Sequence, residues 1–245
     1  MSAASSPLPV VLVTGSGRRL GRALAHAFAD AGYAVALHAH RSLAGRDHVL
    51  ASISAQGGSA WPVGGDLTEE AGIRRVVSET MACAGRLDVL VNCAGVFPDT
   101  PFEDVTFEEW DRVVNLNLRA AFFLSQMFAP SLRSVRGAIV NVASVGAFEP
   151  WVRHIPYNVA KAGLVMLTRA LAKALAPDVR VNAVAPGVIV TPGEEGPPSP
   201  PAEKIPLHRP GTPAEFSRAV LFLARDATYL TGHVLPVDGG FLGAR

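Results

Sequence analysis

Short apolar runs alternate with longer Ala- and Leu-rich stretches along almost the whole chain. The runs are apolar throughout instead of alternating with polar residues, as in strands covered on both faces. We expect strands at Val10–Val13, Ala34–Ala39, Ala60–Val63, Leu87–Val91, Ala138–Val142, Val179–Val184 and Val234–Val237. We expect helices at Arg19–Ala31, Leu43–Gln56, Thr68–Cys83, Phe107–Leu132, Pro156–Leu175 and Pro213–Ala224. This alternation predicts an α/β fold of Rossmann type, a doubly wound, mostly parallel seven-stranded sheet with helices on both faces.

The length of the chain suits one such domain. It has 245 residues, of which 49% are hydrophobic and 18% charged, enough to bury a substantial core. We expect residues 1–9 to form a disordered tail and residues 10–245 a single domain. The prolines and glycines of Pro192–Pro206 exclude a helix interior and predict a flexible loop on the substrate side of the sheet. A tolerated surface loop is the alternative.

Charge and cysteine content exclude several classes of protein. The net charge is +1, so no broad surface for nucleic acid is expected. The two cysteines, Cys83 and Cys93, have no metal-ligand spacing and suit a reducing compartment. The chain has neither a basic, apolar export signal nor the roughly 18 apolar residues that span a membrane. We therefore expect a cytoplasmic protein with no membrane partner and no metal.

A glycine-rich turn joins the first strand to the first helix. Glycines there let backbone N–H groups approach a pyrophosphate, and the helix N-terminus adds favourable partial charge. The candidate cofactor-binding residues in this turn are Gly15, Gly17, Arg18, Arg19, Leu20 and Gly21. The turn predicts a dinucleotide site, with a tight turn that binds nothing as the alternative.

The end of the second strand indicates which dinucleotide is bound. An NAD site needs a carboxylate there for the ribose 2′-hydroxyl, and the chain has none between Asp30 and Asp47. His40, Arg41 and Ser42 stand there instead, and they suit a 2′-phosphate. We predict NADP(H) as the cofactor.

Three residues form a candidate catalytic group. Tyr157 and Lys161 are four residues apart on an expected helix and share one face, and Ser144 follows the fifth strand. A nearby ammonium lowers the pKa of a phenol, which is ordinarily about 10. Tyr157 would then donate a proton to a developing alkoxide while hydride arrives, and Ser144 would hold the same oxygen.

Together with Asn92-Cys93-Ala94-Gly95, Asn117 and Pro186-Gly187, these motifs resemble the short-chain dehydrogenase/reductase family in its compact form. The resemblance implies that Lys161 also holds the nicotinamide ribose and that Asn117 anchors a water in a proton relay. It also implies a homotetramer or dimer formed through the two longest helices. The further cofactor contacts that it implies are Asp66, Leu67, Asn92, Ala94, Gly95, Pro186, Gly187, Val188 and Thr191.

For two of these residues a purely structural role is the alternative interpretation. Asp66 could be a turn residue, and Asn117 could be a helix-interior polar group that bonds the backbone.

Other residues bear on the substrate. Arg19 in place of the second glycine, with His38-x-His40-Arg41-Ser42, is similar to the pteridine reductase branch. In that branch a phenylalanine placed like Phe97 stacks on the pterin ring, although ordinary loop packing explains Phe97 equally well. Ser144 differs from the aspartate of trypanosomatid pteridine reductases and favours carbonyl reduction. Trp151 is a candidate substrate wall or a packing residue.

These features predict an NADPH-dependent reductase that transfers hydride to a carbonyl or pterin-type C=N group of a small molecule. Tyr157 is the expected proton donor. A 3-oxoacyl thioester reductase acting on acyl carrier protein is the alternative of the same class. A non-catalytic NADPH-binding sensor or scaffold is the alternative of another class.

Overall fold

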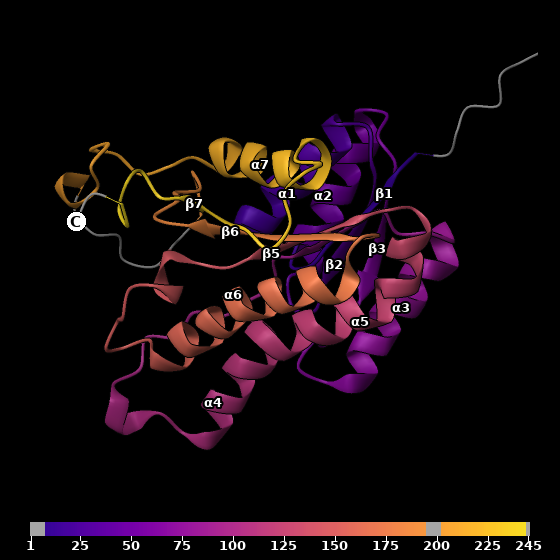
Figure 1. Ribbon diagram of the computed structural model, residues 1–245. Coiled ribbons are helices and arrows are strands. Elements are labelled where there is room, and N and C mark those ends of the chain that lie inside the picture. The colour runs from indigo at the N-terminus through magenta and orange to yellow at the C-terminus, as the bar shows by residue number, and fades with distance from the viewer. Residues whose placement is uncertain (1–7, 195–201, 244–245) are drawn as a thin grey trace, which may run out of the picture.

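A single sheet of seven strands runs through the molecule. The computed structural model describes residues 8–194 and 202–243. The strands are β1 (Val10–Val13), β2 (Ala34–Ala39), β3 (Ala60–Gly64), β4 (Val89–Asn92), β5 (Ala138–Val142), β6 (Arg180–Pro186) and β7 (Val234–Val237). Their order is β3-β2-β1-β4-β5-β6-β7, and every neighbouring pair is parallel (Figure 1). The predicted doubly wound α/β fold is confirmed.

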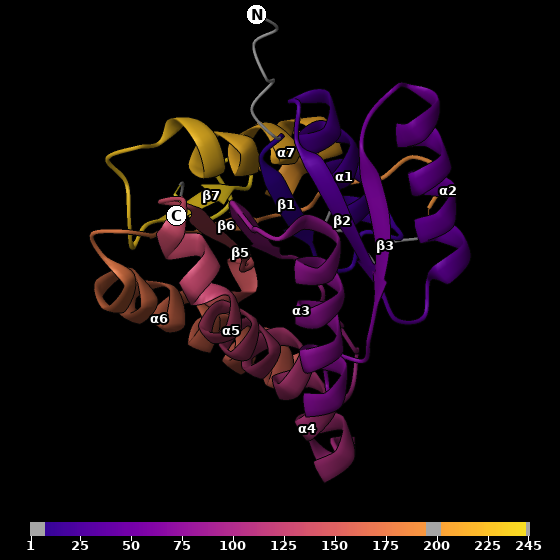
Figure 2. The ribbon, with the colours of Figure 1, turned by 90° about the vertical axis from the view of Figure 1, so that its right-hand side faces the viewer.

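Helices cover both faces of the sheet, as Figures 1 and 2 show. One face carries α1 (Arg19–Asp30), α2 (Leu43–Ala55) and α7 (Pro213–Leu221). The other carries α3 (Glu70–Ala84), α4 (Phe107–Val114), α5 (Ala120–Ser134) and α6 (Ile155–Leu175). Neighbouring residues of one strand therefore enter different cores. Val11 packs with Phe28 of α1, whereas Leu12 packs with Phe128 of α5.

The expected helix Phe107–Leu132 is interrupted. A π turn, Asn115–Arg119, separates α4 from α5 and carries Asn117 at its centre. Such turns occur frequently at functional sites. A second π turn, Phe222–Asp226, follows α7, which therefore ends as an α-helix at Leu221.

One helix begins later than expected. The predicted start of this helix at Thr68 is wrong, because α3 starts at Glu70. The Asp66 carboxylate accepts hydrogen bonds from the Thr68 amide at 2.9 Å and from its hydroxyl at 2.7 Å. These bonds hold Thr68 in a turn before the helix.

The loop after β6 is described at both ends. Pro192–Glu194 follows the strand, and a single 3₁₀ turn, Ala202–Lys204, precedes Pro206. Residues 195–201 of the predicted flexible loop, and residues 1–7 of the predicted tail, lie outside the described residues. Within the described ranges, no helix has the length and apolar character that crossing a bilayer requires.

Candidate active site

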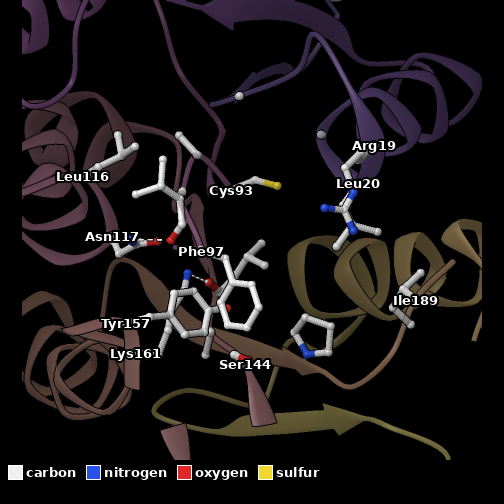
Figure 3. A pocket seen from close by; sticks show the side chains of 18 of the residues that line it. Arg19, Leu20, Cys93, Phe97, Leu116, Asn117, Ser144, Tyr157, Lys161 and Ile189 are labelled. Carbon is white, nitrogen blue, oxygen red and sulfur yellow. Dashed lines mark hydrogen bonds between the residues drawn. The ribbon is translucent and has the colours of Figure 1, made fainter. Parts of the chain in front are cut away.

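A cavity of about 1770 Å³ opens at the edge of the sheet where the strands end (Figure 3). Because all strands are parallel, the glycine-rich turn after β1, Ser144 after β5 and Pro186-Gly187 at the end of β6 reach this same edge. Every predicted site residue except Asn92 lines the cavity. The sheet therefore brings together residues that are far apart in the sequence.

The glycine-rich turn is tight and packs against β2. Gly15 has a φ of +73°, and a Cβ on Gly21 would lie 2.1 Å from the Gly15 carbonyl oxygen. The Ser16 amide donates to the His38 carbonyl oxygen at 2.9 Å. Glycine is needed at both positions, for its conformation at Gly15 and for close approach at Gly21.

His38 holds this turn, a role that the sequence motif containing His38 did not predict. The Gly15 amide donates to Nδ1 at 3.1 Å, so Nε2 carries the proton and donates to the Gly65 carbonyl oxygen at 3.0 Å. Burial lowers the pKa of His38 to about 4, so the ring is neutral at neutral pH. His38 also lines the cavity, and it lies two residues before His40, at the same phase of the strand.

An anion already occupies the N-terminus of α1. The Arg19 amide donates to both carboxylate oxygens of Glu194, at 3.1 and 3.0 Å, and Arg22 forms an ion pair with the same carboxylate. Arg19 has a φ of +46°, a left-handed conformation that glycine adopts without strain. Because this helix N-terminus holds a carboxylate, the residues present fit an anionic group such as a pyrophosphate.

The far end of the cavity carries basic and hydroxyl side chains. His40 and Arg41 directly follow β2, and Ser42 is the N-cap of α2. A Cβ on Gly17 would lie 2.6 Å from the Ser42 carbonyl oxygen, so the glycine-rich turn and the start of α2 are in contact. His40 Nε2 lies 3.3 Å from the second carboxylate oxygen of Asp66. Asp66 is thus a turn residue, as the alternative interpretation had it, and also faces the cavity.

The candidate catalytic residues meet at the other end (Figure 3). Tyr157 and Lys161 come from α6, Ser144 is the N-cap of the 3₁₀ turn Val145–Ala147, and Asn117 comes from the π turn. Lys161 Nζ donates to the Val142 carbonyl oxygen at 2.6 Å and lies 5.6 Å from the centre of the Tyr157 ring.

Asn117 is buried, with one half of its amide bonded and the other free. Nδ2 donates to the carbonyl oxygens of Val113 and Val96, as the alternative interpretation expects. Oδ1 has no partner among the described residues. A Cβ on Gly95 would lie 2.5 Å from Oδ1 and 3.8 Å from Lys161 Nζ, so glycine leaves room there. A buried amide oxygen beside an amine fits the anchoring of a water.

Burial dominates the titration of the pair. It raises the pKa of Tyr157 to about 12, although the hydrogen bond from Ser144 and the charge of Arg19 act in the lowering direction. Burial also lowers the pKa of Lys161 to about 8. The expected depression of the tyrosine pKa by Lys161 is absent here, because burial outweighs every favourable charge and the amine donates to the backbone.

Asn92 lies in the core. Its Nδ2 donates to Asn141 Oδ1 at 2.8 Å, and Asn141 Nδ2 donates to Thr168 Oγ1 at 2.9 Å. This chain of bonds joins β4, β5 and α6 beneath the site. Of the predicted motif, Ala94 and Gly95 reach the cavity and Asn92 supports them.

Four aromatic rings, including that of Tyr157, form a cluster at this end of the cavity. Phe97 is stacked on His154 with ring centres 4.0 Å apart, and its centre lies 4.6 Å from that of Tyr157. Trp151 packs edge-on against Phe97 at 5.8 Å. One face of Phe97 is therefore covered by His154, which favours the loop-packing interpretation while leaving Phe97 and Trp151 on the cavity wall.

Comparison with known proteins agrees with this arrangement. Residues 15–242 match the family adh_short_C2, described as Enoyl-(Acyl carrier protein) reductase. A granaticin polyketide synthase protein of Streptomyces violaceoruber, named ketoacyl reductase 2, is 40% identical over 95% of both chains. The 3-oxoacyl-[acyl-carrier-protein] reductase FabG of Thermotoga maritima is 37% identical, covering 95% of this chain and 97% of its own.

A solved structure is also similar. A blue fluorescent protein from a metagenomic library, in complex with NADPH, superposes with a TM-score of 0.89. It is 31% identical, and the match covers 96% of this chain and 98% of that one. The family match spans nearly the whole chain, and the named relatives are reductases. The chain therefore belongs to the short-chain dehydrogenase/reductase family of oxidoreductases.

Proposed function

We propose that the protein is an NADPH-dependent reductase of 3-oxoacyl thioesters, of the kind presented by an acyl carrier protein. One observation carries the proposal: Tyr157, Ser144 and Lys161 share a cavity with an anion-holding glycine-rich turn. The names of the similar proteins favour a 3-oxoacyl substrate over the pterin-type substrate that the cofactor motif suggested.

The cofactor fits along the length of the cavity. The glycine-rich turn would hold the pyrophosphate, and His40, Arg41 and Ser42 would hold a 2′-phosphate. Gly95, Pro186, Gly187, Val188 and Thr191 would border the nicotinamide half, with Lys161 on its ribose. Bound NADPH would supply the hydride.

The protein's own residues would donate one proton to the substrate and then replace it. A pKa of about 12 keeps the Tyr157 phenol protonated at neutral pH, so it is ready to donate to the alkoxide oxygen. The Ser144 Oγ accepts the Gly146 amide proton at 3.0 Å, which leaves its own hydroxyl hydrogen to hold the same oxygen. Lys161 and a water held by Asn117 Oδ1 would return a proton to the phenolate.

The remaining expectations become parts of the same proposal. Residues 10–245 form one NADP-binding domain of a cytoplasmic homo-oligomer, a dimer or a tetramer. Its partner is a small-molecule thioester or its carrier. Phe97 and Trp151 border the acyl chain next to Tyr157.

A substrate comparison tests the proposal. Purified protein with NADPH is given acetoacetyl-coenzyme A, ethyl acetoacetate or dihydrobiopterin, and the loss of NADPH absorbance is followed. We expect the highest kcat/KM with the thioester. A preference for dihydrobiopterin would replace the proposal by the pterin reading, and tight NADPH binding without turnover would replace it by a sensor or scaffold.

A further inference from the structure

The segment that carries Ser144 is held by α6 on both sides of the serine. Before the serine, Lys161 Nζ donates to the Val142 carbonyl oxygen at 2.6 Å. After it, Asn158 Nδ2 donates to the Gly146 carbonyl oxygen at 2.6 Å and to the Glu149 carbonyl oxygen at 2.7 Å. Asn158 directly follows Tyr157 on α6.

Gly146 connects the asparagine to the serine. Its carbonyl group accepts from Asn158, and its amide donates to Ser144 Oγ at 3.0 Å. A Cβ at this glycine would lie 2.7 Å from the Trp151 ring, so the backbone is packed between that ring and the asparagine amide. Gly146 has little freedom to shift without moving the serine hydroxyl.

We propose that Asn158 is a positioning residue for carbonyl reduction, which holds the Ser144 hydroxyl at the working distance from the Tyr157 phenol. The bonds form a closed path from Tyr157 to Ser144, from Ser144 to Gly146, and from Gly146 to Asn158, the neighbour of Tyr157. Asn158 does not line the cavity and acts only through this path.

The path has a chemical consequence. The serine bond lowers the pKa of the phenol against the opposing effect of burial. If Asn158 no longer holds the turn, the serine hydroxyl can drift, the carbonyl oxygen loses one of its two donors, and the phenol becomes harder to ionise. Both effects act on the chemical step and leave the glycine-rich turn untouched.

Asn158→Ala tests the proposal, which rests on the proposed reductase activity. We expect kcat to fall roughly 10- to 100-fold with the Kd for NADPH unchanged. Asn158→Leu keeps the side-chain volume without donors and should give the same loss, so it serves if the alanine variant folds poorly. The assay uses whichever carbonyl the wild type reduces fastest, so a wrong substrate assignment does not affect it.

The matched control is Asn182→Ala. Asn182 is a buried asparagine that also bonds two backbone groups, through Nδ2 to Leu230 and through Oδ1 from His233, at a distance from the cavity. The Asn182→Ala substitution should lower the melting temperature while leaving kcat within about twofold of the wild-type value. An equal loss of kcat in both variants would assign Asn158 a purely structural role and overturn the proposal.

A double mutant shows whether Asn158 acts through the serine. In a Ser144→Ala background, Asn158→Ala should cause no further loss of kcat, because the group that it positions is gone. If the double variant loses kcat by the product of the two single losses, the residues act independently and the proposal is overturned.

The pKa of the Tyr157 phenol should also be higher in Asn158→Ala than in the wild type. A spectroscopic titration measures it without substrate, and Tyr157→Phe identifies the signal that belongs to Tyr157. An unshifted titration would overturn the proposal even if the chain proved to be no reductase.

Discussion

The phenol of Tyr157 is kept protonated by its surroundings, and this defines the first prediction. Tyr157→Phe should lower kcat at least ~10²-fold while the Kd for NADPH stays unchanged, because the ring still packs but no proton is offered to the alkoxide. Steady-state kinetics and fluorescence titration of NADPH measure the two effects. Retained turnover would show that another group supplies the proton.

The low pKa of Lys161 gives the reduction a pH dependence. Burial lowers that pKa to about 8, so the amine is charged below this pH and loses its charge as the pH rises through it. We expect kcat for reduction to fall across that range, because the relay and the ribose contact both use the ammonium. If kcat does not change with pH until about pH 10, where lysine ordinarily titrates, this role of Lys161 is contradicted.

We expect Arg41 to discriminate between NADPH and NADH. Arg41→Ala should weaken NADPH far more than NADH, since a guanidinium contributes mainly to binding the 2′-phosphate. Binding titrations with both cofactors measure the difference. Equal weakening of both would contradict the assignment of the 2′-phosphate to the end of β2.

For single residues, the sequence predicted which residue types take part in the reaction better than it predicted where their side chains point. Tyr157, Lys161 and Ser144 were predicted because their residue types and spacing suit one reaction, and they line one cavity. Asn92 was misplaced because it still belongs to β4, which is buried along its whole length, and its side chain bonds Asn141 in the core. Asn158 was missed because its partners are backbone carbonyl groups of a segment whose path the sequence does not reveal.

At the scale of elements, β2 and the glycine-rich turn depend on a neutral imidazole. The folded pKa of His38, about 4, lies below its ordinary value of 6.5, so below pH 6.5 the unfolded chain binds more protons. Stability is therefore lost as the pH falls from about 6.5 to 4, by up to roughly 3 kcal/mol. His38→Asn, which can still accept from Gly15, should reduce this loss.

Urea unfolding near neutral pH and at about pH 5 tests the assignment. An unchanged pH dependence in the variant would show that His38 is not the group responsible.

The bond between the loop after β6 and α1 should compete with the cofactor. Glu194→Gln removes the negative charge at the Arg19 amide, so we expect tighter binding of NADPH and of inorganic pyrophosphate. Glu203→Gln, an exposed glutamate in the same loop, is the control. Equal effects of the two substitutions would mean that general surface charge, and not this contact, controls binding.

The strands were predictable to within about two residues because their runs are apolar and bounded by breakers. The π turn at Asn115–Arg119 was not, because it needs no glycine or proline to signal it. The start of α3 was misplaced for a similar reason, since Thr68 suits an N-cap and a turn equally well.

For the whole molecule, α5 and α6 leave large apolar side chains exposed. Phe122, Phe123, Val159 and Met166 lie on these helices, and Met166 is 60% exposed. We expect this face to be covered by another copy of the chain. Met166→Glu should therefore give a smaller particle in light scattering after size exclusion, and an unchanged particle mass would rule out this face as the interface.

The topology as a whole followed from the order of its elements. Parallel strands with intervening helices leave few arrangements, because the crossovers are right-handed. That rule also places the turn after β1 and the serine after β5 at one edge, so the location of the site was predictable from the fold. Its internal bonds depend on side-chain packing, which the order of elements does not determine.

The π turn between α4 and α5 has a consequence for how this chain tolerates change in length. The turn amounts to one extra residue in an otherwise regular helix. That residue rotates α4 by about 100° about the helix axis relative to α5. Deleting one of the other residues of the turn should restore a continuous α-helix and swing Asn117 away from Lys161. Most single substitutions there should be milder than the loss of one residue, whichever residue is removed.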